Sequence, residues 1–256
     1  MFLASEVPPG TGLGSSSAAA VTLIRALSTL LEQSMTKYQI AEIASFIEID
    51  KMKLPIGKQD QYAAAFGGLN KFTFTDKGVT VESLKIDPDV MNTLEKRLML
   101  FFMGNSRESS SILKHQQKSI QNHDSKTIHA LNNIKAIAEN MQCCLEHGNL
   151  DEFALLMHHS WQEKRCLAPG LSTPFIDKCY NLALHNGALG GKINGAGGGG
   201  FLMLYSHEEA QNDITHNLEE YGLKRMNFRF DNQGATVLLN VTNFNNLKID
   251  TYSATS

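Results

Sequence analysis

A loop rich in glycine and serine near the start of the chain is the first candidate for a ligand-binding site. Residues 8–18 read PPGTGLGSSSA, and strong helix formers with apolar side chains at three- and four-residue spacing follow directly. A helix that begins at the serines points its unpaired N–H groups and its partial positive charge at the loop, and glycines let a phosphate approach the backbone. The pattern therefore indicates an anion cradle. Taken alone, a glycine-rich turn capped by Ser15 or Ser16 is the simpler interpretation.

Two carboxylates follow at positions that suit phosphoryl transfer. Glu48 falls near the end of a helix expected over 36–51, and Asp60 lies twelve residues later in the motif GKQDQYAAAFGG at 57–68. In isolation Glu48 would be a solvated helix carboxylate, and Asp60 would cap the short helix that follows. A nucleotide is handled as its Mg²⁺ complex, however, and this cation prefers a carboxylate, a hydroxyl and phosphate oxygens. An acceptor hydroxyl needs a second carboxylate that orients it and takes its proton.

A third cluster of glycines lies late in the chain. Residues 187–200 read GALGGKINGAGGGG, and the apolar run FLMLY follows at 201–205. A flexible linker is rarely bracketed by a helix and an apolar strand, so this cluster is expected to form a fixed loop. Four successive glycines permit a ligand or another chain segment to approach closely.

An arginine among hydroxyls follows a strand expected over 97–103. The motif GNSRESSSIL at 104–113 places Arg107 at the mouth of the next helix. This is either a well-capped helix start or a site for a phosphate already carried by a substrate, since a guanidinium beside free helix N–H groups suits that anion.

The three glycine-containing motifs, at 8–18, 57–68 and 190–200, resemble in type and order those of the GHMP kinases, the superfamily of galactokinase, homoserine kinase and mevalonate kinase. The middle motif is most similar to the sugar-kinase branch that contains D-glycero-D-manno-heptose 7-phosphate kinase and, more distantly, L-fucokinase and galactokinase. The resemblance covers nearly the whole chain.

This resemblance implies ATP and Mg²⁺ as cofactors and assigns roles to individual residues. Asp60 matches the catalytic aspartate, while Ser16 and Glu48 match the magnesium ligands, with Ser15 as the alternative hydroxyl. The nucleotide-binding positions are Pro9, Gly10, Thr11, Gly12, Leu13, Gly14, Ser15, Ser16, Ser17, Gly197 and Gly198. The substrate-binding positions are Lys58, Gln59, Arg107 and Ser109.

The activity implied is ATP-dependent phosphorylation of a sugar hydroxyl. The branch suggests the anomeric hydroxyl of D-glycero-D-manno-heptose 7-phosphate as acceptor, in the synthesis of nucleotide-activated heptose. Two alternatives stay open: another GHMP sugar kinase of the fucokinase or galactokinase type, and a truncated, non-catalytic remnant that binds nucleotide.

The fold implied is α+β and has two lobes. An ATP-binding lobe like ribosomal S5 domain 2 is expected over 1–90, and a ferredoxin-like α+β lobe over 91–256. Full-length relatives carry tens of residues before the first motif. The N-terminal lobe is therefore expected to be incomplete, with an exposed sheet edge and a half-built sugar pocket.

The spacing of hydrophobic residues, and the residues that commonly begin or end helices and strands, predict the elements around these motifs. The second helix is expected to bury a stripe formed by Ile40, Ile43, Ala44, Ile47 and Met52. Expected helices cover 15–31, 36–51, 112–121, 125–147, 149–165, 174–186 and 208–221. Expected strands cover 1–7, 71–75 with 79–81 as a hairpin, 97–103, 201–205, 226–230 and 235–241.

Composition narrows the classes of partner. With 42% hydrophobic and 19% charged residues and a net charge of -3, the chain has no general attraction for nucleic acid or an anionic membrane. Its four cysteines lack the spacing of a zinc site or a disulfide framework. We therefore expect a cytoplasmic protein that binds a small sugar or sugar phosphate. A homodimer and a complementing N-terminal fragment are left open as partners.

Overall fold

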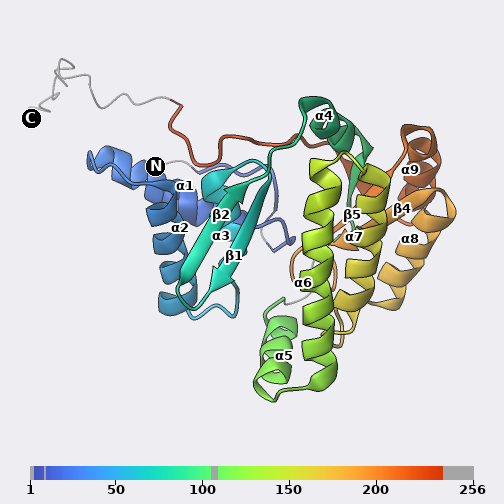
Figure 1. Cartoon of the computed structure of the whole chain (residues 1–256), viewed down its shortest axis with the longest axis horizontal. Coiled ribbons are helices and arrows are strands. Elements are labelled where there is room, and N and C mark those ends of the chain that lie inside the picture. The colour runs from blue at the N-terminus through green and yellow to red at the C-terminus, as the bar shows by residue number, and fades with distance from the viewer. Residues whose placement is uncertain (1–2, 9, 105–108, 239–256) are drawn as a thin grey trace, which may run out of the picture.

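The computed structural model describes residues 3–8, 10–104 and 109–238, without the side chains of residues 109 and 110. Helices combine with antiparallel strands, which confirms the predicted α+β class. The elements form an N-terminal group with a β-hairpin and a C-terminal group built on a four-stranded sheet (Figure 1). The division into lobes at residue 90 stays a prediction. No helix in the described ranges has the length and apolar character needed to cross a bilayer.

The N-terminal group packs three helices against the hairpin. It consists of α1 (Ser15–Leu30), α2 (Lys37–Ser45), the π-helix η1 (Phe46–Lys51), α3 (Gln59–Phe66), β1 (Asn70–Thr75) and β2 (Gly78–Ser83). The hairpin register, with Asn70 opposite Ser83, agrees with the alternation in the sequence. The Thr36 side chain accepts a hydrogen bond from the backbone N–H of Gln39, whose side chain in turn accepts one from the N–H of Thr36, so a capping box fixes where α2 begins.

The buried face of α2 differs from the predicted stripe. Ile40 and Ala44 are buried, but Ile47 and Met52 are 37% and 60% exposed. The face continues instead to Glu48, which is only 2% exposed. The reason is the change from an α-helix to a π-helix at residue 46, because its wider turn carries Ile47 away from the interface.

The C-terminal group surrounds a sheet with strand order β4-β5-β3-β6. Its strands are β3 (Leu98–Phe102), β4 (Ala188–Ile193), β5 (Phe201–Ser206) and β6 (Lys224–Met226). Its helices are α4 (Pro88–Arg97), α5 (Ser109–Gln121), α6 (Ser125–Glu146), α7 (Leu150–Arg165), α8 (Pro174–His185), η2 (Glu208–Ala210) and α9 (Gln211–Glu220). The segment 88–97, which carried no helix in the sequence-based prediction, is a helix that Asp87 caps through the N–H of Asp89.

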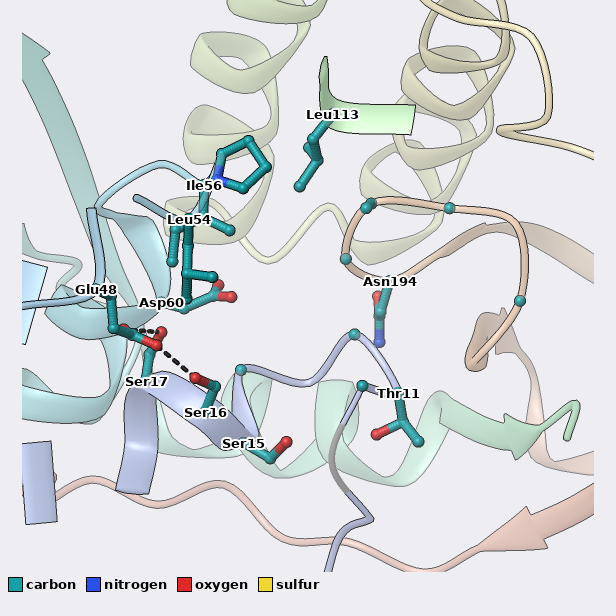
Figure 2. A pocket seen from close by; sticks show the side chains of 18 residues that line it. Thr11, Ser15, Ser16, Ser17, Glu48, Leu54, Ile56, Asp60, Leu113 and Asn194 are labelled. Carbon is teal, nitrogen blue, oxygen red and sulfur yellow. Dashed lines mark hydrogen bonds between the residues drawn. The ribbon is translucent and has the colours of Figure 1, made fainter. Parts of the chain in front are cut away.

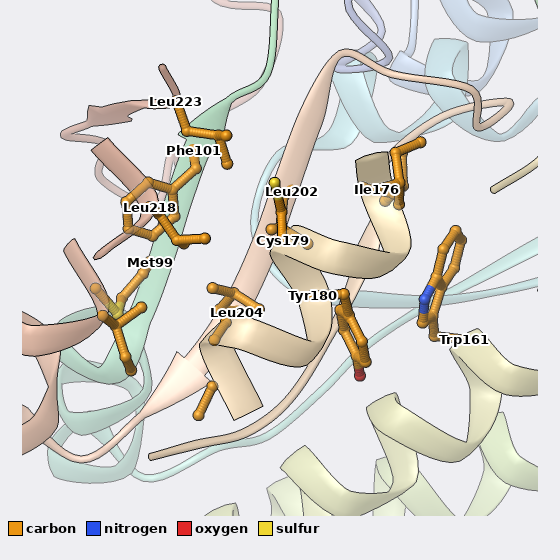
Figure 3. Packing of buried hydrophobic residues seen from close by; sticks show 14 residues of the cluster. Met99, Phe101, Trp161, Ile176, Cys179, Tyr180, Leu202, Leu204, Leu218 and Leu223 are labelled. Carbon is orange, nitrogen blue, oxygen red and sulfur yellow. The ribbon is translucent and has the colours of Figure 1, made fainter. Parts of the chain in front are cut away.

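Alternate residues of the strands face two different layers. Met99 and Phe101 of β3 belong to a core shared with α8 and α9 (Figure 3). Leu98 and Tyr205 point the other way, into a core shared with α4, α6 and α7. Helices therefore cover both faces of this sheet, as the two-residue period of a strand requires.

Strand β4 corrects the prediction that residues 187–200 form one loop. Residues 188–193 pair with β5, and the loop narrows to 194–200. The glycines in this strand serve close packing: a Cβ at Gly190 would lie 1.9 Å from the carbonyl oxygen of Ala154 in α7.

The segment after β6 returns to the N-terminal group without forming the predicted strands. β6 ends at Met226, residues 227–230 and 235–238 are not strand, and 239–241 lie outside the described residues. The N–H of Gly68 donates to Asp231 at 2.6 Å, and the N–H of Ala235 donates to the carbonyl of Ala65 at 3.2 Å. Through these bonds the segment adjoins the C-terminal end of α3.

We expect Gly190→Ala to destabilise the protein by about 3 kcal/mol, because the added methyl group would force α7 off β4. The measurement is the free energy of unfolding in urea, followed by circular dichroism. Gly57→Ala is the matched control, since a Cβ there meets nothing within 4 Å and should change stability by less than about 0.5 kcal/mol. Equal unfolding midpoints for the two variants would contradict this packing.

Candidate active site

A pocket opens where the N-terminal and C-terminal groups meet. One wall is the loop of residues 10–14, here called the first glycine loop, with the start of α1. The opposite wall is the loop of residues 194–200, the second glycine loop, of which Asn194 to Gly197 and Gly199 line the pocket. Glu48 and Asp60 lie on one side and Asn194 on the other (Figure 2). Segments far apart in the sequence therefore share one cavity.

The first glycine loop leaves the start of α1 without a side-chain cap. Gly10, Gly12 and Gly14 have φ values of 77°, 83° and 68°, which glycine adopts readily and other residues rarely do. Gly14 is the N-cap residue, so the expectation of a turn capped by Ser15 or Ser16 is wrong. Because no described side chain caps this helix, its first N–H groups can bind an anion in the pocket.

Glu48 is the most constrained polar group of the pocket. Its Oε1 accepts a hydrogen bond from the Ser16 hydroxyl at 2.5 Å. Its Oε2 accepts bonds from the Ser17 hydroxyl at 2.8 Å and from the Gln61 amide at 2.6 Å. Glu48 is therefore not the solvated carboxylate that the residue suggests in isolation. Its burial is possible because three donors satisfy it.

Asp60 lies in the first turn of α3 and opens onto the same pocket. It is not the N-cap residue of this helix, because Lys58 holds that position. A Cβ at Gly14 would lie 3.2 Å from the Cβ of Asp60, so α3 packs closely on the first glycine loop. The protein around the carboxylate removes part of its water, which raises the pKa of Asp60; the Glu48 charge raises it further, and the Lys164 ammonium opposes both.

The two glycine loops touch through their backbones. A Cβ at Gly12 would lie 2.6 Å from the carbonyl oxygen of Asn194, and one at Gly195 would lie 2.5 Å from the Cα of Gly12. A Cβ at Gly200 would lie 2.2 Å from the carbonyl oxygen of Thr11. Side chains at these glycines would push the loops apart, so the glycines are required for the walls to meet.

Some predicted binding residues lie elsewhere. The Lys58 ammonium pairs with Glu42 at 2.8 Å, and Lys58 and Gln59 line a separate hollow beside the hairpin. Their role in substrate binding stays a prediction, and neither lines the main pocket. Leu13 and Gly198 also lie outside its lining, whereas Gly197 contributes to it.

Three further predicted residues cannot be placed. Pro9 and Arg107 lie outside the described residues, as does the side chain of Ser109. Their assigned roles in nucleotide and substrate binding stay predictions.

Several lining or supporting residues were missed by the sequence analysis. The pocket has an apolar wall of residues 54–56 with Leu113 across from it. Gln61 adjoins Asp60 within the recognised motif, so its position was a signal for it. Residue type alone assigns Lys164 to a solvated helix end, because lysines there usually keep their charge in water.

The oxygen atoms of the pocket suit a hard divalent cation. Ser16 and Glu48 offer a hydroxyl and a carboxylate next to a helix N-terminus that attracts anions. No group of three His, Cys, Asp or Glu side chains in the described part of the chain could hold a metal by itself. Such a site fits Mg²⁺, which commonly takes one or two carboxylates and completes its shell with phosphates and water.

Two family models match the chain. The first, described as GHMP kinases N terminal domain, matches residues 1–68. The second, described as GHMP kinases C terminal, matches residues 129–224. The matched regions contain all three glycine motifs and both carboxylates of the pocket.

Two proteins named as kinases are similar to most of the chain. The chain is 33% identical over 231 residues to D-glycero-alpha-D-manno-heptose 7-phosphate kinase of Campylobacter jejuni, covering 90% of the chain and 68% of that protein. It is 28% identical over 222 residues to the bifunctional fucokinase/GDP-fucose pyrophosphorylase of Arabidopsis thaliana, covering 85% of the chain and 21% of that protein.

Solved structures agree with the fold. A D-glycero-D-manno-heptose 1-phosphate kinase from Bacteroides thetaiotaomicron superposes with a TM-score of 0.69 at 28% identity, covering 90% of the chain and 64% of that structure. A structure described as a putative sugar kinase from Campylobacter jejuni superposes with a TM-score of 0.70 at 31% identity, covering 89% of the chain and 65% of that structure. The chain thus spans about two thirds of the length of these kinases.

We expect Asp60→Asn to stabilise the ligand-free protein at neutral pH. The raised pKa means that folding favours the protonated acid, so the ionised carboxylate costs stability once the pH rises above its ordinary value of 3.8 and through the folded pKa. Because Asp60 opens onto solvent in the pocket, the gain should be small, about 2 °C in the melting temperature.

The measurement is thermal unfolding of both proteins between pH 4 and pH 8. The stabilisation should shrink toward pH 4, where the wild-type carboxylate is increasingly protonated. Asp50→Asn, which changes an exposed carboxylate in η1, is the control for the loss of one acid. A wild-type protein more stable than Asp60→Asn at pH 8 would contradict the raised pKa.

Proposed function

The chain belongs to the GHMP kinases, and from this premise we propose that its pocket transfers the terminal phosphoryl group of ATP to a hydroxyl of a sugar. The observation that carries the proposal is the convergence of the uncapped start of α1 with Ser16, Glu48 and Asp60 in one cavity. A helix N-terminus binds phosphate, a hydroxyl with a carboxylate binds Mg²⁺, and a second carboxylate can take a proton.

The first glycine loop is the proposed phosphate cradle for ATP. Its left-handed glycines keep side chains away from the ligand, and the free N–H groups at the start of α1 face the pocket. The second glycine loop closes the other side of the cradle by contact with Gly12. We assign nucleotide binding to the backbone of both loops.

Ser16 and Glu48 are the proposed ligands of Mg²⁺. The hydrogen bond between them supports Ser16 over Ser15, because it already places the Ser16 hydroxyl on the carboxylate. Bound there, the ion would neutralise charge on the phosphates and hold them for transfer. Ser17 and Gln61 would then keep the carboxylate oriented through its other oxygen.

Asp60 is the proposed general base. The acceptor oxygen forms a bond to the γ-phosphorus, the bond from that phosphorus to the β–γ bridging oxygen breaks, and ADP leaves. The proton of the hydroxyl passes to Asp60 and from there to solvent. A raised pKa makes Asp60 a better proton acceptor than an ordinary aspartate.

For the acceptor we propose D-glycero-D-manno-heptose 7-phosphate, phosphorylated at its anomeric hydroxyl. The support is the similarity to a relative named for this substrate, at 33% identity over 90% of the chain. The fucokinases at 28% identity make fucose the second candidate. Arg107 is the proposed partner of the phosphate already on the sugar.

The test is an ADP-release assay with ATP, Mg²⁺ and a panel of acceptors: heptose 7-phosphate, fucose, mannose, galactose and mevalonate. We expect turnover of heptose 7-phosphate to exceed the others at least about tenfold. ³¹P NMR should then show a new phosphate on the anomeric carbon. Preference for fucose would replace the heptose assignment, and nucleotide binding without turnover of any acceptor would favour the non-catalytic alternative.

We expect Asp60→Asn to lower kcat by about a thousandfold, because the acceptor loses the group that takes its proton. The affinity for a non-hydrolysable ATP analogue, measured by calorimetry, should stay within about threefold, since the loops and the metal ligands are intact. Activity retained by this variant would remove Asp60 from its assigned role.

We expect Glu48→Gln to weaken Mg²⁺ binding at least about tenfold. The readout is Mn²⁺ binding in the presence of the ATP analogue, followed by electron paramagnetic resonance, and it does not depend on turnover. Asp50→Asn, the same chemical change on an exposed residue of the same π-helix, should bind Mn²⁺ like the wild type. Equal Mn²⁺ affinity in all three proteins would contradict the metal assignment.

A further inference from the structure

Lys164 ends a helix where solvated lysines are common, yet its ammonium points into the protein. It lies in the last turn of α7, and its Nζ donates to the carbonyl oxygen of Gly195 at 2.6 Å and to that of Ile193 at 3.3 Å. These two carbonyls belong to the end of β4 and the start of the second glycine loop. An ammonium has three donors, so one remains for another partner.

The loop that Lys164 holds is a wall of the pocket. Asn194 and Gly195 press on Gly12 through backbone atoms, so the position of the second glycine loop fixes the space available above the first. A lysine bonded to both sides of Asn194 prevents this segment from moving away from the pocket. Lys164 is therefore connected to the proposed phosphate cradle through the second glycine loop.

Lys164 also has an electrostatic link to Asp60. The pKa of Lys164 is lowered to about 7: burial is the main cause, the Lys192 ammonium on β4 adds to it, and the Asp60 carboxylate on α3 opposes both. The neighbouring charges on α7 are engaged elsewhere: Arg165 pairs with Asp177 at 2.8 Å, and Glu163 accepts a bond from Asn133 at 3.1 Å. Lys164 on α7 and Asp60 on α3 thus act on each other electrostatically.

We propose that Lys164 is a positioning residue, which holds the second glycine loop against the first and, through its charge, favours the ionised form of the Asp60 carboxylate. This proposal rests on the proposed function for its catalytic meaning. Its two parts, the hydrogen bonds and the charge, can be separated experimentally, because glutamine keeps a donor without the charge and arginine keeps both.

The first test follows Asp60 without any assay of activity. In the full chain labelled with ¹³C at the aspartate carboxyls, the Asp60 signal is identified by its loss in Asp60→Asn made in each background. We expect its titration midpoint to move to higher pH by at least about half a pH unit in Lys164→Gln and Lys164→Met. Lys164→Arg should keep the wild-type midpoint.

The control for this titration is Lys126→Gln, which removes one exposed positive charge from α6 and should leave the midpoint in place. An Asp60 midpoint that is the same in wild type, Lys164→Gln and Lys164→Met overturns the electrostatic part of the proposal. This outcome can be read even if the chain proves to have no kinase activity, so it is distinct from failure of the proposed function.

The second test separates positioning from simple loop support. In kcat/KM against pH, the acidic limb should move to higher pH in Lys164→Gln, while the affinity for the ATP analogue stays within about threefold because the loop keeps a donor. Lys164→Met should show the same displaced limb and also lose at least about fivefold in analogue affinity. Analogue affinity unchanged in Lys164→Met overturns the mechanical part. If the acidic limb of the profile moves in neither variant, Lys164 has a structural role only, and the positioning role is overturned.

Discussion

The site depends on one carboxylate that is kept out of water. Glu48 accepts hydrogen bonds from Ser16, Ser17 and Gln61, so a single buried anion joins α1, η1 and α3. Burying a charge is costly unless donors surround it, and removing one donor leaves most of that cost uncompensated. The three helices therefore pack stably only in the arrangement that brings these donors together. The same arrangement fixes Asp60, because it precedes Gln61 on α3.

A second constraint connects the two groups of elements. The first and second glycine loops lie about as close as two backbones can, with Gly12 against Asn194 and Gly195. Such an approach leaves no room for side chains, which explains why both loops consist largely of glycine. It also places the first glycine loop directly against the backbone of the C-terminal group. Hydrogen bonds from Lys164 hold that second wall in place.

The sequence predicted the parts of this site that depend on local pattern. The start of α1, the hairpin and the order of the motifs follow from residue type and spacing, and the convergence of Glu48 and Asp60 was expected from the resemblance to the GHMP kinases. The burial of Glu48 was not predictable from α2 alone, because it depends on donors from two other helices. Strand β4 was not predicted, because glycine is a poor strand former. Its glycines are explained by the close packing of α7 on the strand, which the sequence alone does not show. The roles assigned to individual side chains stay predictions.

The electrostatics of the pocket explain why an anionic ligand would need a cation with it. The start of α1 attracts negative charge, whereas Glu48 and Asp60 repel it. Burial raises the pKa of Asp60 and the Glu48 charge raises it further, so the two carboxylates disfavour a second negative charge beside the first. A bare triphosphate would meet both effects at once. A triphosphate that arrives with Mg²⁺ presents negative oxygens to the helix N-terminus and positive charge to the carboxylates, so each part of the pocket meets the opposite charge. The pocket therefore favours the complex of Mg²⁺ with a triphosphate over the free triphosphate or the free ion. Lys164 adds positive charge near Asp60.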